Sequence, residues 1–144
     1  MKTYVKGAAF YLLATFPLAF VWHLVVFKGI YAELGMYREE PSVALGFVAI
    51  LIQGLLLSYA FPLVYRGGDP VRAGVKFGLV MGIFLWSSQV VAAAAKHEVS
   101  SLSTWLGIET AYFAVQFLLV GLAIGLAYRT KLEAADDQRL VTGD

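Results

Sequence analysis

Four long apolar stretches alternate with short polar segments along the chain: Gly7–Phe27, Ser42–Val64, Gly74–Ala95 and Trp105–Ala127. Each is long enough for an α-helix to cross a hydrocarbon core of about 30 Å, at about 1.5 Å per residue. Charged residues lie almost wholly outside these stretches, which lack the polar face of a soluble amphipathic helix. The pattern predicts an all-α, polytopic membrane four-helix bundle over residues 1–128 and a polar tail over residues 129–144.

The composition supports this class of protein. Of 144 residues, 60% are hydrophobic and 15% are charged, whereas about a quarter of the residues in a soluble domain are charged. The chain has no cysteine, which excludes disulfides, zinc–thiolate sites, iron–sulfur clusters and thiol nucleophiles. The net charge of +1 argues against a nucleic-acid partner, which would require a basic patch. The lipid bilayer is the partner that the composition predicts.

Basic residues are distributed unevenly between the two sides of the predicted bundle. They collect near the N-terminus, in the loop Arg66–Ala73 and in the tail, whereas the loops Lys28–Pro41 and Lys96–Thr104 contain few. Because cytoplasmic loops carry the excess of Lys and Arg, both termini of this multi-pass protein are predicted to be cytoplasmic. The longer outer loop is expected to form an amphipathic turn of helix on the outer surface, with the apolar residues Ile30, Tyr31, Leu34 and Tyr37.

A weak internal repeat relates the two halves of the chain. Residues Gln53 to Arg66 align without gaps on Gln116 to Arg129, and the paired glutamines are not easily produced by apolar composition alone. The repeat favours two tandem helical hairpins in the same orientation. Chance similarity between Leu-rich segments is the alternative.

Small residues recur at helical spacing in three of the apolar stretches. Such stripes let helix backbones approach closely in lipid, where burying Leu gains little. Packing within the chain is their expected use, and a homodimer face is the alternative. The residues concerned are Gly46, Gly54, Ser58, Gly74, Gly78, Gly82, Gly121 and Gly125.

Polar side chains at membrane depth are candidates for a binding site, because they are costly in lipid and by default face the bundle interior. Glu109 and Gln116 lie two turns apart on one face of the fourth stretch, and Gln89 should share the packed face of Gly82. His23 is close to the outer end of the first stretch, where an imidazole can bind a metal, haem or protons. We expect one outer cavity, with Trp86 as its wall, lined by His23, Gln53, Trp86, Gln89, Glu109 and Gln116.

The same residues also have a purely structural interpretation. The glutamines would hydrogen-bond between helices and contribute about 1 kcal/mol or less each, while Glu109 would stabilise a helix N-terminus. A metal shared by His23 and His97 would need a third ligand, from Glu98 or Glu109. No Gly-x-Ser-x-Gly motif, phosphate loop or pair of intramembrane carboxylates indicates an enzyme. The sequence therefore predicts no catalytic residue and no metal ligands, and it identifies no cofactor.

Several short motifs carry a resemblance to a known class of protein. They are Trp22-His23 and Tyr31-x-x-Leu34-Gly35 within Phe16–Arg38, Gln53-Gly54 followed by Tyr65-Arg66-Gly67-Gly68, and Phe77-Gly78-Leu79. The chain resembles small four-helix bacterial inner-membrane proteins that are catalogued as domains of unknown function. The resemblance implies a four-crossing architecture in a bacterial inner membrane, and it implies no reaction.

The leading hypothesis is a non-enzymatic integral membrane protein, either a small-ligand binding module or an accessory subunit of a membrane complex. The accessory subunit would have exposed apolar grooves and no closed cavity. One alternative is a small transporter or channel, which would have to be a dimer because four short-looped helices offer little room for a pathway. The other is a haem- or metal-binding membrane protein that uses His23. The sequence leaves a homodimer or a larger membrane complex open.

Overall fold

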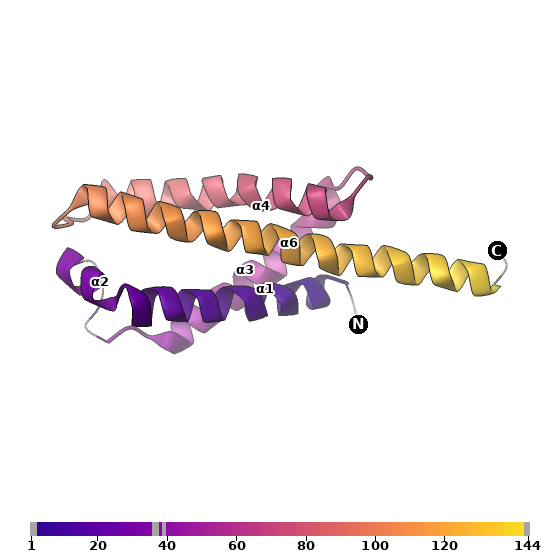
Figure 1. The fold of residues 1–144 in the computed structure, drawn as a ribbon, viewed down its shortest axis with the longest axis horizontal. Coiled ribbons are helices and arrows are strands. Elements are labelled where there is room, and N and C mark those ends of the chain that lie inside the picture. Colours follow the sequence, from indigo (N-terminus) through magenta and orange to yellow (C-terminus); the bar gives the residue numbers. More distant parts are fainter. Residues whose placement is uncertain (1–2, 36–37, 39, 143–144) are drawn as a thin grey trace.

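The computed structural model describes residues 3–35, 38 and 40–142, and within them every regular element is helical (Figure 1). The all-α bundle predicted from the sequence is confirmed. In chain order the elements are α1 (Thr3–Val21), the π-helical turn η1 (Trp22–Val26), α2 (Lys28–Leu34), α3 (Val43–Val64), α4 (Pro70–Trp86), the π-helical turn η2 (Ser87–Val91), α5 (Ala92–Ala94) and α6 (Leu102–Thr142).

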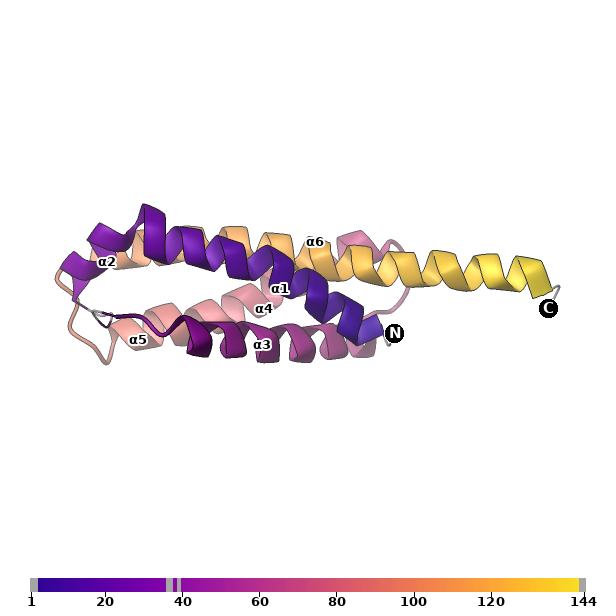
Figure 2. The same cartoon turned by 90° about the horizontal axis from the view of Figure 1, so that it is seen from below.

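Four helical segments of the described chain are long and apolar enough to cross a membrane: Tyr4–Val26, Val43–Val64, Pro70–Ala94 and Leu102–Thr130. They coincide with the four predicted stretches and indicate a multi-pass membrane protein. The polar tail does not start a separate segment, because α6 continues into it as one helix of 41 residues. Its yellow end projects beyond the other helices in Figures 1 and 2.

A tight turn joins α3 to α4, as the sequence predicts. Gly67 and Gly68 have positive φ angles of 99° and 85°, which L-residues with a side chain rarely adopt. The carboxylate of Asp69 then accepts a hydrogen bond from the backbone N–H of Val71 at 2.9 Å, and Pro70 occupies the first helical position. The turn therefore reverses the chain and starts α4 within a few residues.

The backbones of α4 and α6 are in direct contact along a glycine seam. A methyl group added at Gly78 would lie 2.5 Å from the carbonyl oxygen of Phe117 and 2.8 Å from the Cα of Gly121. A methyl group at Gly74 would lie 2.8 Å from the Cα of Gly125. The prediction that these stripes pack within the chain is therefore confirmed for α4 and α6.

The first two long helices pack through a smaller contact of the same kind. Gly7 of α1 lies against Ser58 of α3, and Gly54 lies against the ring of Tyr11. Gly46 does not take part, because nothing lies within 4 Å of the position of an added methyl group. Ser58 and Gly121 hold aligned positions of the internal repeat and both mark a helix crossing, which supports the interpretation of two tandem hairpins.

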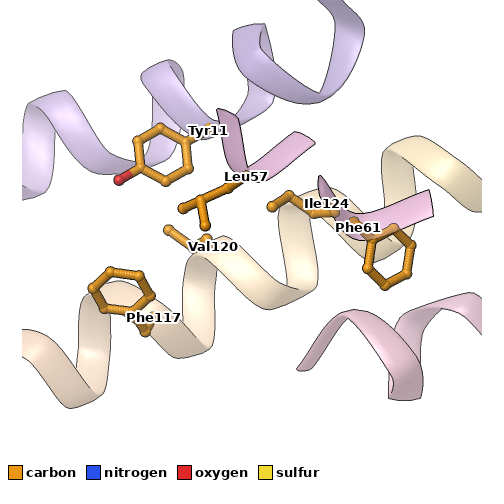
Figure 3. Close-up of a cluster of buried hydrophobic side chains, with 6 residues drawn as sticks. All are labelled: Tyr11, Leu57, Phe61, Phe117, Val120 and Ile124. Carbon is orange, nitrogen blue, oxygen red and sulfur yellow. The ribbon is translucent and has the colours of Figure 1, made fainter. Parts of the chain in front are cut away.

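Two clusters of buried side chains fill opposite ends of the bundle. We call the end with α2 and the loop before α6 the α2 end, and the end from which α6 projects the tail end. The core of the tail half, shown in Figure 3, consists of Tyr11, Leu57, Phe61, Phe117, Val120 and Ile124. The cluster at the α2 end consists of Tyr31, Leu34, Val90 and Trp105.

The amphipathic turn of helix predicted in the longer outer loop is present as α2: its polar side is exposed, and its apolar side packs into the bundle. Tyr31 and Leu34 are buried inside the cluster at the α2 end, and Ile30 packs against that cluster. The hydroxyl of Ser100 also donates a hydrogen bond to the carbonyl oxygen of Glu33 at 2.8 Å. Tyr37, the fourth apolar residue of this prediction, lies outside the described residues.

Candidate ligand-binding cavity

A cavity of about 440 Å³ lies in the α2 half of the bundle, among α3, α6 and the two π-helical turns. Its volume falls within the range of about 300–1,000 Å³ that is usual for small-molecule sites. The structure brings together five of the six residues that the sequence singled out, as well as His97. The polar lining consists of His23, Gln53, Gln89, His97, Glu109 and Gln116.

Trp86 is the predicted site residue that the structure places elsewhere. Its indole N–H donates a hydrogen bond to the hydroxyl of Thr110 at 3.0 Å, and it lines a separate, apolar groove beside Gly82. The expected wall of the cavity is formed instead by Trp105 and Tyr112 of α6. The reason is geometric: the glycine face of α4 lies directly on α6, so Trp86 lies across this seam from the cavity.

Glu109 is the centre of a group of polar contacts near the α2 end. Glu109 is 4% exposed, and its carboxylate accepts a hydrogen bond of 2.5 Å from the hydroxyl of Tyr31. The Nε2 atom of His23 lies 3.7 Å from the same carboxylate oxygen. The His23 ring is stacked on Tyr31 at 5.0 Å and meets Tyr112 edge-on at 4.4 Å. Residues of η1, α2 and α6 thus hold one carboxylate in the cavity wall.

A second polar group lies deeper in the bundle and joins three helices. The hydroxyl of Tyr11 donates to the amide oxygen of Gln53 at 2.8 Å and accepts from the amide nitrogen of Gln116 at 3.4 Å. The two glutamines that the internal repeat pairs therefore meet on one hydroxyl. Within the described residues, the amide nitrogen of Gln53 and the amide oxygen of Gln116 have no further hydrogen-bond partner. Both groups are thus available to a bound molecule.

No motif or repeat in the sequence singles out Tyr11, although its residue type inside an apolar stretch is a general signal. A tyrosine hydroxyl inside an apolar stretch has no water to bond and must find a partner inside the protein. Tyr11 is fully buried and lies about two helical turns inside the span Tyr4–Val26, deeper than the aromatic residues that are usual at the ends of a span.

The two π-helical turns carry cavity residues, with His23 on η1 and Gln89 on η2. A π turn contains more residues than an α-helical turn, so it changes which side chains face the neighbouring helix. In a regular helix Gln89 would share the packed face of Gly82. In the structure Val90 is buried on that side instead, whereas Gln89 is exposed and lines the cavity. The prediction of its packed face is wrong for this reason.

The cavity ends at the apolar core of the tail half. Its deepest polar lining residues are Gln53 and Gln116, which are hydrogen-bonded to Tyr11. The ring of Phe117 belongs both to the cavity lining and to the core. Beyond them Leu57, Val120 and Ile124 are buried (Figure 3). Among the described residues, a polar chamber therefore lies in the α2 half of the bundle, and a packed apolar core lies in the tail half.

The described residues contain no group of three His, Cys, Asp or Glu side chains placed to hold a metal ion. His23 and His97 line the same cavity, and Glu109 lies beside His23, but Glu98 is not part of the lining. The chemistry that the cavity offers is therefore one carboxylate, neutral amides, imidazoles and aromatic faces.

Comparisons with known proteins identify no relative of this chain: no family model matches it, and neither a curated protein nor a solved structure matches it. Its function is therefore inferred from the geometry and chemistry of the cavity.

Proposed function

We propose that this chain is a non-enzymatic integral membrane protein that binds a small ligand in the cavity around Glu109. The observation that carries the proposal is the convergence of polar side chains from four elements on one chamber at membrane depth. If these side chains served only to hold the helices together, each polar group would be expected to hydrogen-bond another one. Among the described residues, the amide nitrogen of Gln53 and the amide oxygen of Gln116 have no hydrogen-bond partner. Both glutamines line a chamber of about 440 Å³.

The proposed orientation places the α2 end outside and both termini in the cytoplasm. Lys6, Arg66, Arg72 and Arg129 lie at or near the tail end of the bundle, and an excess of basic residues marks the cytoplasmic side. The cavity then opens toward the exterior. A bacterial inner membrane is the location that we propose, on the resemblance described above.

The geometry favours binding over conduction. A channel through one chain would require a polar route from one end to the other, whereas the buried side chains of Leu57, Phe61 and Ile124 close the tail half. A transporter would need a second copy or a rearrangement that opens this core. The accessory subunit considered above would have exposed apolar grooves, such as the one beside Gly82, and no closed cavity. The polar chamber favours ligand binding over that alternative.

Filling the cavity should abolish ligand retention without unfolding the protein. Ala49 lines the cavity from α3 and is itself exposed, so Ala49→Trp places an indole in the chamber while leaving the packed core intact. We expect native mass spectrometry of gently solubilised protein to show a bound small molecule that Ala49→Trp loses.

The matched control is Ala111→Trp, an exposed position of α6 that lines none of the described cavities. This variant should keep the bound molecule. Equal retention by both tryptophan variants would place any bound molecule outside the cavity and contradict the proposal.

A further inference from the structure

We infer that the cavity recognises an organic cation with an apolar body, such as a substituted ammonium, through the carboxylate of Glu109 and the aromatic rings around it. This inference rests on the proposed function, because it names the chemical class of the ligand for the same cavity. Three features of the chamber support it: the charge of the lining, the aromatic rings and an opening between α3 and α4.

The formal charge of the cavity lining is negative. Glu109 is the only carboxylate among the described residues that line it, and no Lys or Arg of the described chain does so. Arg38 lines an adjoining cavity together with His23 and Ser42, and its side chain is exposed. The carboxylate of a buried Glu109 at membrane depth is strongly favourable for a cation that enters the chamber.

His23 lies between a backbone carbonyl of α1 and the Glu109 carboxylate. Its Nδ1 atom lies 3.0 Å from the carbonyl oxygen of Ala19, an acceptor, so Nδ1 carries a proton. Its Nε2 atom lies 3.7 Å from the Glu109 carboxylate. The His23 ring, stacked on Tyr31 and edge-on to Tyr112, is part of the aromatic wall.

Aromatic rings form most of the remaining wall. Trp105, Tyr112, Phe113 and Phe117 all line the chamber. The negative faces of such rings attract ammonium groups, and the attraction increases when water is excluded. One carboxylate among several aromatic faces is therefore complementary to a cation whose charge is covered by apolar substituents, and the amide oxygen of Gln116 adds a further acceptor.

The cavity can be entered from the side as well as from the α2 end. Within the described residues, α3 and α4 make no extensive contact although they follow each other in the chain. The lining residues Gly46 and Ala49 on one side and Gln89 on the other are exposed. An amphipathic cation held in the headgroup layer could reach Glu109 through this opening without crossing the core.

Two probes of the same shape and different charge test the inference. Benzyltrimethylammonium carries a quaternary nitrogen, and neopentylbenzene has a carbon atom in its place. Binding of each labelled probe to the full chain in detergent would be measured by equilibrium dialysis against protein-free micelles. We expect the cation to bind at least tenfold more tightly than its neutral counterpart, and Ala49→Trp to abolish binding of both.

The decisive variant is Glu109→Gln, which keeps the shape of the side chain and an acceptor for the Tyr31 hydroxyl. It should weaken binding of the cation at least tenfold and leave binding of the neutral probe unchanged. Glu133→Gln is the matched control, because Glu133 is an exposed acid of α6 beyond the predicted span; it should bind both probes as the unmodified chain does.

The outcomes separate this inference from the proposed function. Equal binding of the two probes, or a preference for the cation that survives Glu109→Gln, would overturn the cation inference while the cavity remained a binding site. The same conclusion follows if neither probe binds but native mass spectrometry shows a molecule that Ala49→Trp displaces. Absence of both probe binding and a displaceable molecule would overturn the two proposals together.

Discussion

Replacing Gly78 with Leu lowers the free energy of unfolding by about 3 kcal/mol or more, because the new side chain has no space to occupy. A Cβ at this position would lie 2.5 Å from the carbonyl oxygen of Phe117 and 2.8 Å from the Cα of Gly121. Both atoms belong to the backbone of α6 and cannot rotate away. The two helices must separate, and the contacts along the whole seam weaken. Thermal unfolding in detergent, or unfolding by SDS in mixed micelles, measures the effect.

Gly107→Leu is the matched control, because Gly107 lies in α6, the helix against which Gly78 packs, and nothing lies within 4 Å of a methyl group added there. This variant should be as stable as the unmodified chain or slightly more stable, since Leu has a higher helix propensity than Gly. Equal stability of Gly78→Leu and Gly107→Leu would show that α4 and α6 do not pack through the glycine seam.

Replacing Tyr31 with Phe destabilises the protein by about 2 kcal/mol, because it removes a hydrogen bond to a buried carboxylate. The hydroxyl of Tyr31 donates to Glu109 at 2.5 Å and joins α2 to α6. Without it, the carboxylate stays buried with fewer donors, and α2 has lost a polar contact with the bundle. Beyond the lower stability, hydrogen exchange measured by mass spectrometry should become faster in residues 28–34.

Tyr59→Phe provides the comparison, because Tyr59 is an exposed residue of α3. It should change neither stability nor exchange. Combining Tyr31→Phe with Glu109→Gln should cost less than the sum of the two single changes, since the neutral amide needs the donor less than the carboxylate does. Strict additivity would show that the two side chains do not interact in the folded protein.

The sequence predicted the architecture because membrane spans follow from length and apolar composition. The seam between α4 and α6 was also predictable, since Gly74, Gly78 and Gly82 recur at a spacing that places them on one helix face. The paired glutamines were found for a third reason: a polar amide in lipid must have a partner, and the internal repeat marks both.

The remaining details depend on helix phase and on contacts between distant segments. The π-helical turn η2 moves Gln89 off the packed face, and no pattern in the sequence predicts such a turn. Trp86 was expected in the cavity because it follows the glycine stripe, but the seam itself lies between it and the chamber. Tyr11 and Tyr31 are central to the polar contacts, and only folding brings them to Gln53, Gln116 and Glu109.

The central claim is that a polar chamber enters the membrane from the α2 end and ends at the apolar core. The chain has no cysteine, so a single introduced thiol is the only site for a thiol reagent. In intact cells, a membrane-impermeant thiol reagent added outside should modify Gln53→Cys, which lines the chamber. It should not modify Leu57→Cys, about one turn deeper in the core. Protection of Gln53→Cys together with modification of Leu57→Cys, or equal modification of both, would contradict the account.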